Sequence, residues 1–561
     1  MVSKTEEILG RFLNERSLSG NPLLKVLYNW AQSQAIPYWN RPEEYKNALI
    51  QIFKGASENT QISKAGKEKD RHKDIPQDLR VVALTANGIR AIPMSEIPCG
   101  LPFAHHTREK GYLDIEPESS VILGSNGSGK TTLYTAFELA SLGRSLTTEA
   151  RNLAEPNAQQ NAILNAETEF DHDKASARLT TLSGTLDFNY ADATLSERIR
   201  IPASFLCSEY DERQLEKEEI TLEWMCEQLG IRNVYHLYRF IEYVQNAYIE
   251  AKELKKQLDQ LNKGNVYILD IKDNRGIDEN DKKSTARKSN PKANNNRANE
   301  KKEAFVNEYG ISIESIDFTK LPKRHITALH KAIRKEINDS IRTLFEISNR
   351  FMPAIQKVFN YQETDMISIK LNDKKAENED FISLSLQIYL GVDSPKAISA
   401  TQTESRNCYE TMAKATKSPR EYYNTFRFKL YVLGLKISLA IATQRIHRIN
   451  FPIVIDDIFE SADFRNRHQI NKFVKCLIKN YYNLKHSEKY PLQIILFTHD
   501  EVIADGFYRG MLLHSPEGNV TLSRLNHPHA VEDKDLVKAK FTNKSGQRQE
   551  LFFKNLATRI H

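Results

Sequence analysis

The chain lacks long hydrophobic runs and has few cysteines. Its 561 residues contain no stretch of about 18 or more apolar residues, the length that a membrane-spanning helix needs. We therefore expect no membrane partner. The cysteines are scattered, odd in number and without the close spacing of zinc sites, so they read as reduced thiols: Cys99, Cys207, Cys226, Cys408 and Cys476.

The beginning of the chain also lacks the pattern of a secretion signal. Residues 1–7 read Met-Val-Ser-Lys-Thr-Glu-Glu, and no apolar run follows them. A signal peptide has a basic start and then an apolar stretch. Together with the cysteines, this predicts a cytoplasmic protein.

Positive charge is concentrated in one segment. The net charge is +6, whereas residues 282–302 hold eight Lys or Arg and one Glu, which is +7, so 6 − 7 leaves −1 elsewhere. The segment has almost no apolar residues, which predicts a loose loop. It is either a solvated linker or a contact to nucleic acid through phosphate neutralisation.

The most informative stretch is residues 121–132, Val-Ile-Leu-Gly-Ser-Asn-Gly-Ser-Gly-Lys-Thr-Thr. An apolar strand enters Gly-x-x-x-x-Gly-Lys-Thr, and a helical pattern follows, which is the order of a phosphate-binding P-loop. Its glycines let backbone N–H groups surround phosphates, and the helix N-terminus adds positive charge. The candidate nucleotide-binding residues are Gly124, Ser125, Asn126, Gly127, Ser128, Gly129, Lys130, Thr131 and Thr132.

A chance glycine-rich turn is the alternative interpretation of this stretch, and the flanking strand and helix argue against it. In a P-loop the lysine reaches the β- and γ-phosphates and the threonine hydroxyl ligates Mg²⁺. We therefore expect Lys130 and Thr131 to serve ATP or GTP with Mg²⁺ as cofactor.

A second site follows a buried strand much later in the chain. Ile453-Val454-Ile455 leads into Asp456 and Asp457. The first carboxylate suits a Walker B role, holding hydrated Mg²⁺, and the second stands where a base or water-orienting residue is needed. A third strand pattern ends in Thr498-His499-Asp500, where His499 is either structural or a contact of the γ-phosphate.

Periodicity divides the chain into four expected parts. Residues 1–77 are a helical segment, and 78–221 form an α/β lobe with the P-loop. Residues 222–360 form an antiparallel helical hairpin whose basic linker is 263–305. Residues 361–561 form a second lobe with Asp456, Asp457 and His499. Apolar positions recur every three or four residues at 235–261 and 326–344, while period-two patterns mark strands at 79–84, 184–188, 203–207, 366–371 and 381–390.

The three sites together resemble those of ABC-type ATPases. Asp456-Asp457-Ile-Phe-Glu-Ser-Ala-Asp463 is similar to the Walker B and D-loop string of that superfamily. The resemblance implies a two-lobed α/β head in which Asp463 crosses a dimer interface and His499 acts as the switch histidine. Asn87-Gly-Ile-Arg90 is similar to the element that opens SMC, Rad50 and RecF heads, so Arg90 is either a nucleotide contact or a surface turn residue.

The chain departs from the superfamily pattern in three places. The signature region reads Asn-Thr425-Phe-Arg427-Phe-Lys without glycine, so Thr425 or Arg427 would have to replace the usual serine facing the partner subunit's nucleotide. Asp457 is one methylene shorter than the usual glutamate, which predicts slow ATP turnover. No clear Q-loop glutamine is present, although Ser208, Glu209 or Gln214 could serve.

Among soluble ATPases of this kind, the short helical hairpin (222–360) and the Asp-Asp-x-Phe-Glu-Ser string look most like those of the PtuA-type ATPase subunits of Septu and retron-associated antiphage systems. That resemblance implies a head-to-head homodimer or higher oligomer. It also implies an HNH nuclease partner and, in retron versions, reverse transcriptase with RNA-linked DNA. The alternatives are a RecF-like or Rad50-like ATPase that binds DNA directly, or an ATP-locked scaffold.

Overall fold

The computed structural model describes the chain in segments. They are residues 4–15, 23–24, 27, 42–53, 77–109, 112–146, 174–190, 201–208, 210–211, 215, 222–262, 291–316, 318, 323–359, 366–372, 383–389, 416–417, 425–459, 462–484, 490–516, 518–528, 531 and 535–560. The chain divides into two compact units, the first made of Met1–Glu68 and Asn233–Ile337, the second of Lys69–Arg232 and Asn338–His561.

The first unit is helical where it is described. Apolar side chains at helical spacing are buried along its two longest helices, among them Leu237, Ile241 and Val244 in one and Ile326, Leu329 and Ile333 in the other. This confirms the two helices expected from periodicity. The helices, two of which also supply residues to the second unit, are α1 (Lys4–Glu15), α3 (Pro42–Phe53), α9 (Arg232–Asn262), α10 (Pro291–Tyr309) and α11 (Lys323–Val358).

Part of the basic segment is helical, so the prediction of a loop is wrong from Pro291 onward. Helix α10 runs from Pro291 to Tyr309. Proline suits the first helical position, and Phe305 and Tyr309 are 4% and 2% exposed, with Tyr309 packed 5.2 Å from the Tyr243 ring. Burial of these rings stabilises a helix whose polar composition hid it. Residues 263–290 of the expected linker lie outside the described residues.

The second unit contains a six-stranded sheet that we call the site sheet. Its order is β19-β16-β6-β15-β14-β9, and all neighbours pair in parallel except β19. Parallel strands are buried on both faces and read as continuous apolar runs, as β15 does. The strands are β6 (Ser119–Leu123), β9 (Leu206–Cys207), β14 (Ile453–Asp456), β15 (Ile494–Thr498), β16 (Val520–Leu525) and β19 (Ala557–Arg559).

A second six-stranded sheet, mostly antiparallel, has the order β17-β18-β3-β2-β7-β8. Its strands are β2 (Val81–Asn87), β3 (Cys99–Pro102), β7 (Ser176–Thr181), β8 (Gly184–Asn189), β17 (Leu536–Thr542) and β18 (Arg548–Asn555). Three smaller pairings complete the described strands: β1 (Gln77–Asp78) with β13 (Ile449–Asn450), β4 (Ala104–Glu109) with β5 (Tyr112–Pro117), and β10 (Met366–Asn372) with β11 (Ser383–Tyr389) and β12 (Thr416–Lys417).

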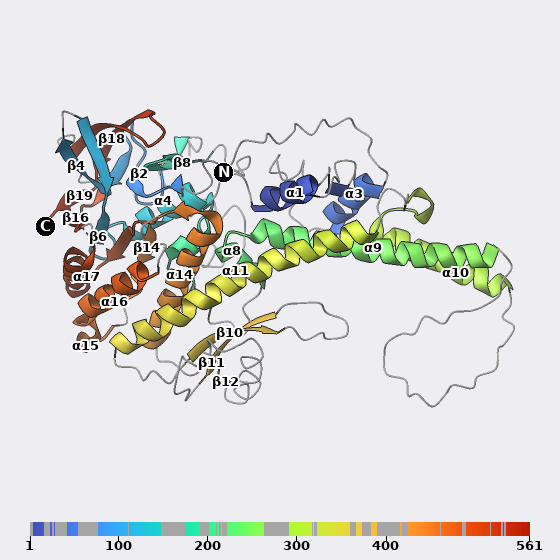
Figure 1. The fold of residues 1–561 in the computed structure, drawn as a ribbon. Helices are drawn as coiled ribbons and strands as arrows, with labels where there is room; N and C mark the ends of the chain where they lie inside the picture. The colour runs from blue at the N-terminus through green and yellow to red at the C-terminus, as the bar shows by residue number, and fades with distance from the viewer. Residues whose placement is uncertain are drawn as a thin grey trace. The chain divides into compact units, whose positions relative to one another are not determined.

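Helix α4 (Lys130–Leu142) packs against both large sheets. It contacts β2, β7 and β8 of the second sheet and β14 and β15 of the site sheet, and in Figure 1 its ribbon lies among their strands. Nearly all of its side chains are buried. Helix α17 (Glu501–His514) packs against β6, β15 and β16 and against α16 (Ile470–Tyr482). A Cβ at Gly510 would lie 2.7 Å from the Val474 Cβ, so glycine permits this close helix contact.

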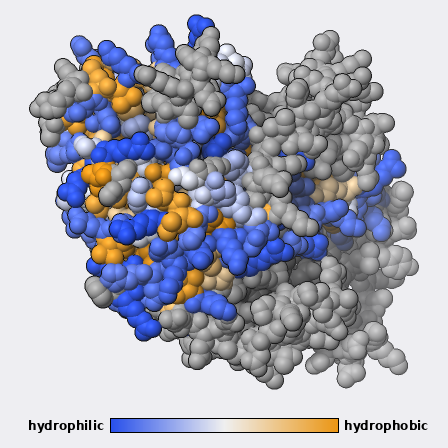
Figure 2. Space-filling model, turned by 60° about the vertical axis from the view of Figure 1, so that its left-hand side comes forward, coloured by the Kyte–Doolittle hydropathy of each residue, from blue (hydrophilic) through white to orange (hydrophobic). Residues whose placement is uncertain are grey.

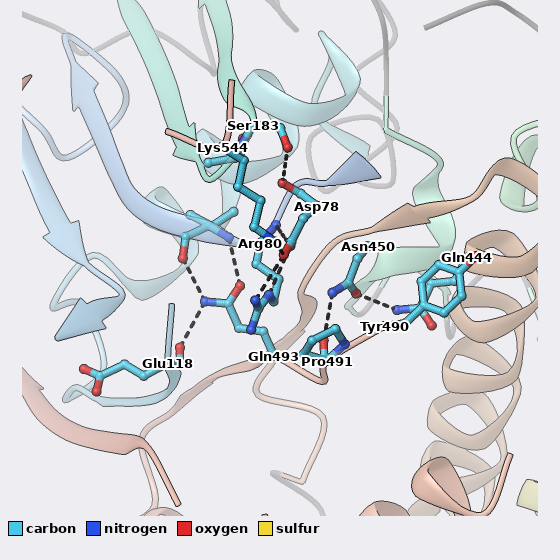
Figure 3. A network of polar contacts seen from close by, with 12 residues as sticks. Asp78, Arg80, Glu118, Ser183, Gln444, Asn450, Tyr490, Pro491, Gln493 and Lys544 are labelled. Carbon is cyan, nitrogen blue, oxygen red and sulfur yellow. Dashed lines mark hydrogen bonds and ion pairs between the residues drawn. The ribbon is translucent and has the colours of Figure 1, made fainter. Parts of the chain in front are cut away.

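One glutamine side chain joins the two large sheets (Figure 3). Gln493, just before β15, accepts a hydrogen bond from the Val81 N–H at 2.8 Å and donates to the Val81 carbonyl at 2.8 Å and the Glu118 carbonyl at 3.0 Å. Beside it, Asp78 binds Arg80 and Lys544. Burial raises the pKa of Asp78, but the two cations lower it more, so its pKa lies below the ordinary value.

A buried lysine positions the helix that precedes β14. Helix α14 (Thr425–His447) has Lys436 fully buried at its middle. The Lys436 ammonium lies 2.9 Å from Asp211 and donates to the Ala203 carbonyl at 2.8 Å and to Gln228 at 2.6 Å. Burial raises the pKa of Asp211, and the lysine charge opposes that shift. The other oxygen of Asp211 accepts from the Ser208 N–H at 3.1 Å, which gives the buried carboxylate a second partner.

Hydrophobic and hydrophilic residues are interspersed on the described surface of the face in Figure 2. Within the part of the chain that is described, no helix combines the length and apolar character needed to cross a bilayer. Four described cysteines, Cys99, Cys207, Cys226 and Cys476, are free thiols, while Cys408 lies outside the described residues.

Candidate active site

Three neighbouring strands of the site sheet end at one edge and bring the predicted residues together. Leu123 of β6 pairs with Thr498 of β15, and Phe497 pairs with Asp456 of β14. Because these strands are parallel, the segments that follow them emerge at the same edge. Ligands of open α/β sheets bind at this edge. The P-loop, the two aspartates and His499 therefore share it.

The loop after β6 has the backbone that a phosphate cradle needs. Gly127 and Gly129 have φ of 84° and 98°, a left-handed region that other residues rarely adopt. A Cβ at Gly124 would lie 2.4 Å from the Ser128 Oγ, so only glycine fits there. Ser125 and Asn126 are exposed and Thr132 is buried at the start of α4.

Lys130 lies within this loop. Its side chain is 7% exposed, and its ammonium donates to the carbonyls of Gly124 at 2.7 Å and Ser125 at 3.1 Å. Burial lowers the pKa of Lys130, and the charges of Asp457 and Asp456 raise it in part, so both carboxylates act on the ammonium. A buried cation that has only carbonyl partners at hydrogen-bond distance is suited to an incoming anion.

Two observations show that the loop residues fit a phosphate chain. The Ser128 Oγ is buried and has no hydrogen-bond partner among the described residues. A Cβ at Gly127 would meet nothing within 4 Å, so open space faces this part of the loop. An unpaired buried hydroxyl is costly unless a ligand pairs with it, and a phosphate oxygen would do so.

Asp457 and His499 form a direct pair across β14 and β15. Asp457 Oδ2 lies 2.6 Å from His499 Nδ1, and the Asp457 N–H donates to the Phe497 carbonyl at 3.0 Å. Asp457 has φ of 45°, which aspartate tolerates better than most residues. Because a carboxylate only accepts, Nδ1 carries the shared proton. Both side chains are about one-quarter exposed, at 25% and 27%.

Thr131 and Asp456 are the residues that could hold Mg²⁺. Each is partly exposed; Thr131 is in the first turn of α4 and Asp456 ends β14. Hydroxyl and carboxylate oxygens are suitable ligands, since Mg²⁺ usually takes one or two protein groups with phosphates and waters. Among the described residues, no cluster of three or more His, Cys, Asp or Glu could hold a metal by itself.

Arg90 lies beside the helix of the P-loop. It has φ of 48°, and its guanidinium donates to the buried Thr135 hydroxyl of α4 at 3.1 Å. Thr135 is one turn beyond Thr131. Arg90 is therefore oriented by α4 from a partly exposed turn, and its role as a nucleotide contact stays a prediction.

The segment after Asp457 is joined to the His499 segment by Arg467, which sequence reasoning missed. Arg467, at the end of α15 (Phe464–Arg467), donates through Nε to the Ala462 carbonyl at 2.9 Å and lies 2.8 Å from Asp500. Asp500 follows His499 and caps α17 by accepting from the N–H groups of Val502 and Ile503. Asp463 is exposed, and its carboxylate accepts from Asn466 N–H. In the sequence, only the position of Arg467, four residues after Asp463, pointed to a role for this arginine near the site.

We expect Arg467→Gln to slow ATP hydrolysis about 10- to 100-fold, because a small displacement of catalytic groups is enough for such a loss. ATP affinity should stay within about twofold, since Arg467 is outside the P-loop. Asp500→Asn keeps the helix cap but removes the ion pair, so it should have the same effect. Single-turnover rates in a double-mutant cycle check this, and fully additive losses would contradict the link.

The remaining predicted residues lie on other elements. Thr425 is exposed at the first position of α14, and Arg427 is partly buried two residues further. Ser208 follows β9, next to β14, and its buried hydroxyl accepts from the Tyr210 N–H at 3.3 Å. Its hydroxyl is therefore already engaged within the protein. Glu209 and Gln214 lie outside the described residues.

No protein-family model and no curated protein matches the chain. Solved structures that it resembles include the SMC head of Pyrococcus furiosus bound to the C-terminal domain of ScpA, with 11% identity, TM-score 0.38, and coverage of 85% of this chain and 96% of that one. The structure of RecF with ATPrS has 12% identity and a TM-score of 0.36, and the match covers 81% of this chain and 98% of that one. The SMC head of Thermotoga maritima has 10% identity and a TM-score of 0.29, and the match covers 85% of this chain and 100% of that one. These likenesses are distant, so the interpretation of the site depends on its own geometry.

Proposed function

We propose that the protein binds ATP and hydrolyses it slowly with Mg²⁺. The observation that carries this is the convergence of a glycine loop, a buried Lys130 and the Asp457–His499 pair at one sheet edge. Backbone N–H groups and Lys130 would hold the phosphates, and Arg90 would support the loop. Mg²⁺, bound by Thr131 and Asp456, would offset the charge of the β- and γ-phosphates.

Asp457 would orient the attacking water and accept its proton. The carboxylate is held by His499 and by its own backbone bond to Phe497, so little reorganisation is needed. Its short side chain reaches less far than a glutamate would. This supports slow turnover and a role as a switch.

A complete site would need a second copy of the chain. Asp463 is exposed just beyond Asp457, and Thr425 is exposed at the start of α14. Exposed polar residues at these positions suit contacts to the nucleotide of a partner head, with Arg427 as the alternative. The motifs resemble those of two-lobed ABC heads that work as dimers, and this resemblance supports a site shared between two copies.

The cellular role that the motifs favour is regulation of a nuclease. Asp456-Asp457-x-Phe-Glu-Ser resembles PtuA-type subunits, which supports an antiphage complex with an HNH nuclease and, in a retron version, reverse transcriptase with RNA-linked DNA. The second candidate role is direct action on DNA, as in RecF-like or Rad50-like ATPases. The third candidate role is a scaffold that binds ATP without hydrolysing it. Co-purification of a nuclease favours the first, and ATP-dependent binding to DNA ends without one favours the second.

Steady-state turnover of the purified chain tests the ATPase proposal. We expect Mg²⁺-dependent release of phosphate well below the enzyme median of about 10 per second, with head association that requires ATP. A coupled phosphate assay and light scattering measure both. Turnover of tens per second would contradict a slow switch, and the absence of ATP binding would contradict the site.

A further inference from the structure

The exposed face of α16 has a row of lysines. Lys472, Lys475 and Lys479 occupy positions i, i+3 and i+7 and are exposed, and Arg465 is exposed on α15 before them. The orientation of α16 is set by its opposite face, where Ile470, Phe473, Val474, Leu477, Ile478 and Tyr481 are buried. At 1.5 Å per residue, the three ammonium groups are spread over roughly 10 Å.

No carboxylate neutralises this row from its own helices. Residues 464–482 contain no Asp or Glu. Three acids of α17 and the residue before it have cationic partners, at 2.8 Å for Asp500 with Arg467, 2.9 Å for Asp505 with Arg509, and 3.1 Å for Glu501 with Arg524. The exposed Asp463, just before α15, accepts from the Asn466 N–H at 2.8 Å. Among the described residues, no ion pair joins a carboxylate to Lys472, Lys475 or Lys479, and the two helices add only positive charge, in contrast to α9, where Glu253 and Asp259 lie among its lysines.

The chemistry of the row suits a nucleic-acid duplex. Evenly spaced lysines are compact point charges that match repeating phosphates without reading bases. Of the rings on α16, Phe473 and Tyr481 are buried, and Tyr482 is half-buried with its ring 5.6 Å from that of Tyr481. The helix therefore presents no fully exposed ring on which single-stranded bases could stack. A duplex presents a phosphate charge every 1.7 Å or so, about twice the density of one strand.

We propose that Lys472, Lys475 and Lys479 of α16 bind the phosphate backbone of double-stranded nucleic acid without sequence preference. This proposal deepens the proposed function by placing the nucleic-acid partner on a surface of the second unit. Only a connection between duplex binding and ATP rests on the proposed function. Helix α15 begins directly after Asp463. A duplex on this face is thus bound one helix away from the D-loop segment.

The test removes the three charges with glutamine, which keeps helix propensity. The full chain with Lys472→Gln, Lys475→Gln and Lys479→Gln is titrated against labelled duplex DNA, duplex RNA and single-stranded DNA between 50 and 200 mM salt. The slope of log K against log salt is negative, and each lost phosphate contact reduces its magnitude by about 0.9. We expect the magnitude of the slope for one or both duplexes to fall by about 2 to 3 and the affinity to fall about 10- to 100-fold.

The matched control replaces Lys252, Lys255 and Lys256, three exposed lysines of α9, with glutamine. It should retain most of the affinity and slope. Equal losses in both triple variants, or no duplex binding by the unchanged chain, would overturn the proposal, as would a loss confined to single strands. ATP binding is measured in each preparation. If the triple variant of α16 loses duplex binding and still binds ATP normally, the result supports α16 as the duplex-binding surface. If the variant loses duplex binding but the unchanged chain does not bind ATP either, the result contradicts only the ATPase proposal.

Discussion

Replacement of Lys130 by methionine is expected to weaken ATP binding about 10- to 100-fold. Methionine keeps an unbranched chain of similar length, so the loop retains its packing while the ammonium is lost. A charge-assisted hydrogen bond is worth about 1.5–3 kcal/mol, and a tenfold change in affinity is about 1.4 kcal/mol. Lys130 would make at least one such bond to the phosphates. Titration calorimetry measures the affinity directly.

The pH dependence of binding gives an independent check on the same residue. Burial lowers the pKa of Lys130 despite the nearby carboxylates. The ammonium is therefore lost at a lower pH than in an exposed lysine, and ATP affinity should begin to fall earlier on the alkaline side. The Lys130→Met variant should lack this dependence. Unchanged ATP affinity in that variant, with an unchanged melting temperature, would contradict the assignment of the loop.

The parts of this fold that sequence predicts well are those in which local pattern and chemistry agree. The P-loop could be placed because its glycines, lysine and threonine are contiguous and its flanking strand and helix have clear periods. The strands before Asp457 and His499 are continuous apolar runs, as buried parallel strands are. The resemblance of the three motifs to those of ABC-type ATPases implied one shared site, and the structure shows that all three strands end at the same edge.

The features that sequence did not show are contacts between distant segments. Gln493 binds Val81 across 412 positions, and Lys436 meets Asp211 from another helix. Lys436 is the one charged residue within the apolar run 431–443, but nothing in the sequence identifies Asp211 as its partner. Helix α10 was missed for a related reason, because its stabilisation comes from two aromatic rings, whereas its composition is that of a polar linker. The expected strand at 203–207 begins as a 3-10 turn, Ala203–Phe205.

Asp457→Asn is the second large expected effect, and it should act on the rate without acting on binding. Asparagine accepts the left-handed φ of 45° at this position as readily as aspartate, and its carbonyl can still accept from His499. What is lost is the negative charge and the capacity to take a proton. Loss of a general base typically costs about 10²- to 10⁴-fold, so single-turnover hydrolysis should fall by that amount.

Asp456→Asn is the matched control, because the two residues are adjacent and the change is the same. Asp456 ends β14 and is assigned to Mg²⁺, so its variant should bind ATP more weakly in Mg²⁺ and equally well in EDTA. Asp457→Asn should bind ATP normally in both and keep the heads associated, since hydrolysis no longer separates them. If Asp457→Asn hydrolyses ATP at the normal rate, the Asp457–His499 pair is structural. If both variants lose binding alike, the edge holds a single metal site and the division of roles between the two aspartates is wrong.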